Sequence, residues 1–244
     1  MALFVVLRPM LFKLLYSLSI LLLSLSLAWL LLAPLNFLYP LWHDYGVIEQ
    51  GIERYAPENR YKAGFADTSA EQRYELFAQI NRAIHQHGEG LAQISYESAT
   101  SGGPQLLLRE PEVVHLQDVA NLMDVLAWVV AANIALFVLL LFWGRRTKGL
   151  LPGVKQVLAF NLALIVLLTA LVLMIGPTAV FNQLHIWVFP AEHQWFFYYQ
   201  ESLMSTMMLA PVLFAYIAGL LLLVSVLILL MLVFGLRRLS ESRR

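Results

Sequence analysis

The sequence predicts a mainly α-helical membrane protein with four transmembrane helices and a small α+β extracytoplasmic domain between the first and second helix. Two observations lead to this prediction. The chain of 244 residues is 60% hydrophobic and only 13% charged, which is typical of polytopic membrane proteins. Four apolar runs, near 14–35, 125–143, 156–176 and 208–235, are each long enough to cross a bilayer as a helix.

Charge at the ends of these runs predicts their orientation. The basic residues that adjoin the ends of the runs share one predicted side, namely Arg8, Lys13, Arg145, Arg146, Lys148, Lys155, Arg237, Arg238, Arg243 and Arg244. Segment 177–207 has neither Lys nor Arg. The positive-inside rule therefore places both termini in the cytoplasm and segments 36–124 and 177–207 outside.

Five regions follow from this topology. They are a cytoplasmic tail with span 1 (1–35), an extracytoplasmic domain (36–124), spans 2 and 3 with a basic cytoplasmic loop (125–176), an aromatic outer loop (177–207), and span 4 with a cytoplasmic tail (208–244). We expect span 1 to be a retained signal anchor that ends at Pro34 and Pro40, because its apolar core is too long for a cleaved signal peptide.

Two compositional features exclude several classes of function. The chain has no cysteine, so it forms no disulfide and uses no thiol chemistry. Its formal net charge is zero, so we expect no nucleic-acid partner.

The extracytoplasmic domain carries recognisable local signals. Asp67-Thr-Ser-Ala-Glu-Gln resembles a helix start, and apolar residues then recur at helical spacing, which predicts one amphipathic helix over 69–87. The runs 91–96 and 104–109 flank Ser-Gly-Gly at 101–103, which predicts two short strands joined by a turn.

The stretch from Glu110 to Asp124 organises the rest of the chain. Pro111 between two acids begins a helix well, and no breaker follows before Gly144. A helix of this length exceeds the hydrocarbon thickness of a bilayer, so its first turns protrude. His115 and Asp118 lie three residues apart and therefore share a face.

The pair allows two interpretations. Asp118 could orient His115 as a general base, or both could be solvated groups at the interface. His185, in the aromatic segment 177–207, is likewise either a second catalytic group or an interfacial ring.

Other polar residues give weaker signals. His85 and His87 are two residues apart, which is poor spacing for shared metal ligands on a helix, so we expect no metal. Asn133 and Asn161, inside spans 2 and 3, are expected to form hydrogen bonds between helices.

The stretch Glu112-Val-Val-His115-Leu-Gln-Asp118-Val, followed directly by a span, resembles the signature of the lipoprotein intramolecular transacylases, a family of bacterial four-span membrane proteins. The segment Glu89-Gly-Leu-Ala-Gln-Ile-Ser-Tyr96 is similar too. In the second outer segment, His185, Phe189 and Trp195 occur in the order that the family shows, although Leu184 and Trp187-Val188 depart from its pattern.

The resemblance implies a reaction. An acyl chain at the glycerol sn-2 position of a diacylglyceryl lipoprotein moves to the α-amine of the lipoprotein's own N-terminal cysteine. It implies no cofactor, His115 with Asp118 as base, His185 as the group that polarises the ester, and Glu112 and Trp195 as supporting residues. The roles of the two histidines could be exchanged. It also implies a monomer in the bacterial inner membrane, with lipoprotein and membrane lipids as partners and the site on the outer face.

Two alternatives stay open. The protein could be a non-enzymatic lipid-binding or assembly protein in which the histidines are incidental, or a lipid-ester hydrolase that uses the same histidines with water. Distant histidines would favour the first alternative. Convergent histidines would favour acyl transfer or hydrolysis, which the mass of the product distinguishes.

Overall fold

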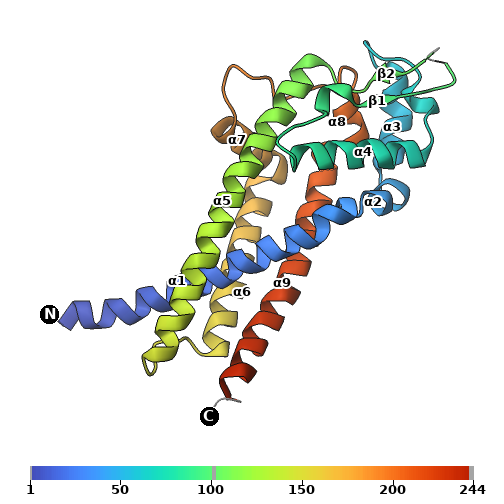
Figure 1. Ribbon diagram of the computed structural model, residues 1–244. Helices are drawn as coiled ribbons and strands as arrows, with labels where there is room; N and C mark the ends of the chain where they lie inside the picture. Colours follow the sequence, from blue (N-terminus) through green and yellow to red (C-terminus); the bar gives the residue numbers. More distant parts are fainter. Residues whose placement is uncertain (1, 101–102, 242–244) are drawn as a thin grey trace. The chain divides into compact units, whose positions relative to one another are not determined.

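The computed structural model describes residues 2–100 and 103–241, with side chains over 8–100 and 103–238. The chain forms two compact units, each made from segments that are distant in sequence (Figure 1). Unit 1 comprises Met1–Leu31, Ala127–Gly176 and Gly219–Arg244, and unit 2 comprises Leu32–Leu126 and Pro177–Ala218.

The described residues are mainly helical. In chain order the elements are α1 (Ala2–Leu32), η1 (Ala33–Leu38), α2 (Tyr39–Tyr45), α3 (Ile48–Tyr55), η2 (Ala56–Glu58), η3 (Phe65–Asp67), α4 (Ala70–Ile84), η4 (Leu91–Gln93), β1 (Ser95–Tyr96), β2 (Gln105–Leu106), α5 (Glu110–Arg146), α6 (Val154–Ile175), α7 (Pro177–Val188), α8 (Leu203–Met208) and α9 (Val212–Glu241).

Four helical stretches in the described part of the chain are long and apolar enough to cross a membrane. They are Arg8–Tyr45, Glu110–Arg146, Val154–Ile175 and Val212–Arg238. This confirms the four predicted spans, although α5 is longer than the expected 110–143 and α9 begins four residues after the predicted position 208.

Unit 1 packs parts of α1, α5, α6 and α9 around an apolar core. Tyr16 meets Phe137 with ring centroids 5.4 Å apart. The other buried members of this cluster are Ile20, Leu21, Leu140, Val157, Leu229 and Val233. Most of α6 instead exposes apolar side chains, as a helix in contact with lipid does.

The two asparagines expected to join helices behave differently. Asn133 accepts a hydrogen bond from the Ser19 hydroxyl at 2.8 Å and donates to the Ser19 carbonyl at 3.1 Å, which confirms the expectation for this residue. Asn161 is fully buried, yet neither end of its amide has a partner among the described residues, so the expectation was wrong there.

The two prolines after span 1 have different effects. Helix α1 ends at Leu32, two residues before Pro34, as expected. Pro40, however, occupies the first turn of α2 and begins a helix instead of ending one, because the first turn needs no proline N–H. Asn81 stabilises the bend between α1 and α2 by donating a hydrogen bond to the carbonyl of Ala33 at 2.7 Å.

Unit 2 contains the predicted helix and hairpin in shortened form. Ser69 caps α4 by accepting from the Gln72 amide at 3.2 Å, and the helix ends at Ile84 instead of residue 87. The strands are two residues each and pair antiparallel, with Ser95 opposite Leu106. Residues 101 and 102 of the expected turn lie outside the described residues.

The segment predicted as an aromatic outer loop is only partly a loop. Its first twelve residues form α7, and α8 begins at Leu203. Its residues also belong to the same compact unit as 32–126, so a single folded body includes both predicted outer segments. The aromatic composition of 177–207 concealed a helix start at Pro177, a residue well suited to a first helical turn.

The Ser19–Asn133 contact gives a testable prediction for unit 1. Asn133→Ala leaves the Ser19 hydroxyl without its partner and should lower the free energy of unfolding by about 1 kcal/mol, the usual scale for a polar contact between membrane helices. Leu139→Ala, at a side chain that is 64% exposed on the same helix, is the matched control. Denaturation in detergent measures the free energy of unfolding of both variants. Equal stability of the two variants would contradict the prediction.

Candidate functional site

The first histidine lies near the start of α5. Two acids, Glu110 and Glu112, occupy the first turn of this helix, where they interact favourably with its positive end. His115 follows one turn after Pro111 and is only 7% exposed. Because Leu116 and Ala120 are also buried, this face of α5 points into unit 2.

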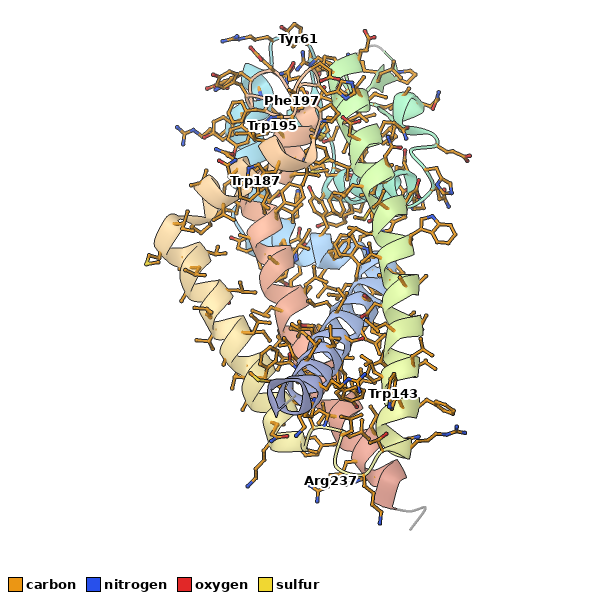
Figure 2. The ribbon with its side chains drawn as sticks, turned by 90° about the vertical axis from the view of Figure 1, so that its left-hand side faces the viewer. Tyr61, Trp143, Trp187, Trp195, Phe197 and Arg237 are labelled. Carbon is orange, nitrogen blue, oxygen red and sulfur yellow. The ribbon has the colours of Figure 1, made fainter. Side chains whose placement is uncertain are left out.

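The second histidine lies on α7, which the loop prediction did not anticipate. His185 is four residues after Phe181 and four before Phe189, so the three rings share one face of the chain. Ring centroids are 4.1 Å apart for Phe181 and His185, and 5.2 Å apart for His185 and Phe189. The other face of α7 carries Trp187, which is 74% exposed (Figure 2).

The two histidines meet within an aromatic enclosure. Their ring centroids are 6.0 Å apart, with an angle of 33° between the ring planes. Phe189 packs edge-on against His115 at 5.0 Å. Trp195 lies 5.0 Å from His185, and Phe197 lies 6.1 Å from His115.

Residues 189–201, which we call the aromatic strap, provide much of this enclosure. The strap has neither helix nor strand and is drawn as an extended loop after α7 (Figure 1). Trp195 and Phe197 belong to it (Figure 2). It therefore covers the two histidines with side chains instead of with regular secondary structure.

Asp118 does not orient His115, so the predicted pairing was wrong. Its carboxylate accepts a hydrogen bond from Nδ1 of His193 in the strap, at 2.7 Å. Nδ1 of His115 is buried and has no hydrogen-bond partner among the described residues. The spacing of three residues placed Asp118 and His115 on one face correctly, but spacing alone could not reveal a competing histidine 75 residues later.

Glu112 holds Ser202, the residue that directly follows the strap. This residue is 0% exposed, and its carboxylate accepts from the Ser202 hydroxyl at 2.5 Å and from the Arg109 amide at 2.8 Å. The Arg109 guanidinium lies 3.3 Å away. Ser202 is the N-cap of α8 and accepts from the Ser205 amide. Buried charge is thus compensated by hydrogen bonds and an ion pair.

The proton position on His185 follows from its partner. The Phe181 carbonyl, 2.8 Å from Nδ1, can only accept, so Nδ1 carries the hydrogen. The neutral ring then has its lone pair on Nε2. Burial lowers the pKa of His185 below its usual value, and the bond to the Phe181 carbonyl opposes this shift. His185 is therefore neutral at pH 7 and able to accept a proton.

The site offers two imidazoles packed among aromatic side chains. In the part of the chain that the structure describes, no three His, Asp or Glu side chains gather closely enough to hold a metal ion. Such a pair is suited to moving protons between atoms of one bound molecule.

All five predicted site residues fall in this one region of unit 2. His115, His185 and Trp195 form the enclosure, while Glu112 and Asp118 hold the strap. Sequence reasoning missed His193 and Ser202 as their partners. The signal that could have indicated His193 was its position between the two predicted aromatic residues Phe189 and Trp195.

The family model described as lipoprotein intramolecular transacylase Lit matches residues 14–211. No curated protein matches the chain in sequence.

Two solved structures have a similar fold. Both are of the membrane integral lipoprotein intramolecular transacylase Lit from Bacillus cereus. One, in which a histidine is replaced by arginine, is 15% identical with a TM-score of 0.66, over 99% of this chain and 96% of that chain. The other is 16% identical with a TM-score of 0.64, over 97% of both chains. With most of its length matched by the family model, the chain belongs to the lipoprotein intramolecular transacylase family and is an acyltransferase of the membrane.

Proposed function

We propose that this protein moves the sn-2 acyl chain of a diacylglyceryl-modified lipoprotein to the α-amine of that lipoprotein's N-terminal cysteine. The product is an N-acylated lyso-form lipoprotein. The observation that supports this proposal best is the 6.0 Å separation of two imidazoles in one aromatic enclosure. Amine and ester belong to one molecule, so the protein's main task is orientation, which can supply a large part of the rate enhancement.

His185 is the base in this mechanism. As the amine nitrogen attacks the ester carbonyl, it must lose one proton, and the oxygen that leaves must gain one. Nε2 of His185 holds the lone pair, because the Phe181 carbonyl occupies Nδ1. It takes the proton from nitrogen and returns it to the leaving oxygen, so no other proton donor is required.

His115 stabilises the oxygen. Once the amine attacks, negative charge develops on the former carbonyl oxygen, and an N–H donor aimed at it is most effective in an apolar surrounding. Phe189 and Phe197 provide that surrounding at His115. This arrangement exchanges the roles that the sequence suggested, because Asp118 is bonded to His193 and leaves His115 without a carboxylate partner.

The hydrolase alternative differs only in the nucleophile. Water would attack the same ester and release a free fatty acid. Packed aromatic side chains around both histidines favour the amine, because they limit the access of water to the ester. A purely lipid-binding role gives no reason for two imidazoles to converge with one tautomer fixed.

Unit 2 belongs on the outer side of a bacterial inner membrane in this proposal, where lipoprotein N-termini are exposed. Both termini and the basic loop 145–155 then lie in the cytoplasm, following the distribution of Lys and Arg. The protein acts as a monomer, with lipoprotein substrate and membrane lipids as partners and without metal, cofactor or nucleic acid.

The histidine roles predict the behaviour of three variants. His115→Ala and His185→Ala should each lower turnover by about 100-fold or more, the usual scale for a lost acid, base or oxyanion donor. The double variant should be little worse than either single one, because groups that act together are not additive. Mass spectrometry of the lipoprotein N-terminus with purified protein measures each rate.

His87→Ala is the matched control, because His87 is an exposed histidine of unit 2 that bonds Asp124 away from the enclosure. It should retain wild-type turnover. A folded His185→Ala protein with wild-type activity would exclude His185 as the base.

Topology is tested on the cysteine-free chain. Ala99→Cys, at an exposed position near the strands, should react with a membrane-impermeant maleimide in intact spheroplasts. Thr147→Cys, between α5 and α6, should react only after the membrane is opened, since the loop is basic and cytoplasmic. The opposite labelling pattern would contradict the proposed orientation.

A further inference from the structure

His193 and Asp118 form a hydrogen-bonded pair at the edge of the site that the proposed reaction does not use. The Nδ1 nitrogen of His193 and Oδ2 of Asp118 are 2.7 Å apart. Their side chains are 36% and 13% exposed, so the pair lies where the enclosure meets solvent. A contact between a histidine N–H and a carboxylate is among the stronger hydrogen bonds in proteins.

The pair is the main polar attachment of the strap. Within residues 189–198, the other hydrogen bonds among described residues are local, such as Gln194 to the Phe196 carbonyl, or lead back to α7. Among the hydrogen bonds of the described residues, the His193–Asp118 bond is the one that joins this stretch to α5. The far end of the strap is held separately, by Arg60 to the carbonyl of Gln200 at 2.8 Å.

The position of the pair links it to both catalytic rings. Asp118 lies one helical turn after His115 on α5. His193 lies between Phe189, which packs on both histidines, and Trp195, which packs on His185. A bond at this point therefore determines whether the aromatic side chains of the strap stay against the imidazoles.

We propose that the His193–Asp118 bond is a clasp that positions the aromatic strap over His115 and His185, so that the acyl ester meets the lipoprotein amine and not water. The proposal rests on the proposed acyl transfer. His193 and Asp118 are positioning residues, because they act through Phe189 and Trp195. Without the clasp, water attacks the ester carbonyl, and a free fatty acid and the lyso-lipoprotein alcohol are formed in place of the amide.

The test uses full-length protein in detergent micelles with a diacylglyceryl lipopeptide that has a free α-amine. Mass spectrometry measures the N-acylated product and the free fatty acid in the same reaction. Their ratio does not depend on how much of a variant is folded. Asp118→Ala and His193→Ala should each slow N-acylation about tenfold, the scale of one lost charge-assisted hydrogen bond, and should raise the proportion of fatty acid.

Two isosteric variants separate positioning from general destabilisation. The amide nitrogen of Asn occupies the place of a histidine Nδ1, and that of Gln the place of Nε2. His193→Asn should therefore retain the bond to Asp118 and restore the wild-type product ratio, whereas His193→Gln should behave like His193→Ala. The double variant Asp118→Ala with His193→Ala should be no worse than either single one.

The chain offers a matched control pair on the same helix. His87 donates from Nδ1 to Asp124 of α5 at 2.9 Å, and this pair includes no residue of the strap. His87→Ala and Asp124→Ala should leave the product ratio unchanged. Equal product ratios for wild type, His193→Ala and His193→Gln would overturn the clasp, as would additive effects of the two alanine substitutions. Absence of any N-acylated product from the wild type would instead refute the proposed function.

Discussion

The site depends on keeping two imidazole rings close together in an apolar surrounding. His115 of α5 and His185 of α7 are 70 residues apart in sequence, and each ring packs on aromatic side chains from the strap. Buried imidazoles favour their neutral form, which can both accept and donate a proton. Proximity and neutrality together make the pair suitable for transferring a proton from an amine to an alcohol oxygen.

Two polar contacts with α5 hold this apolar arrangement in place. Glu112 bonds Ser202, just after the strap, and Asp118 bonds His193 within it, and both acids lie within the first three turns of α5. A buried carboxylate such as Glu112 is costly unless it is hydrogen-bonded, so its contacts restrict Ser202 to one geometry. The start of α5 thus serves as the frame to which the strap is attached, and α7 contributes the second ring.

Sequence reasoning predicted the features that arise from local patterns. The spans follow from apolar runs, the start of α4 from its capping residues, and the shared face of His115 and Asp118 from helical spacing. It failed where a residue's role depends on partners that are distant in sequence. Asp118 bonds a histidine 75 residues away, and Asn161 is buried without the interhelical partner that its type suggested. Helix α7 was concealed because its aromatic composition is equally typical of interfacial loops.

The central claim is that the acyl chain moves from the ester to the amine of one lipoprotein molecule, with His115 and His185 assisting the transfer. A crossover measurement tests it directly. Two lipoproteins are mixed. One has deuterated acyl chains and unlabelled peptide, and the other has unlabelled acyl chains and isotope-labelled peptide. Mass spectrometry then measures the masses of the N-acylated peptides. The account predicts products that retain their original combination of acyl chain and peptide. Mixed combinations, or free fatty acid as the main product, would contradict it.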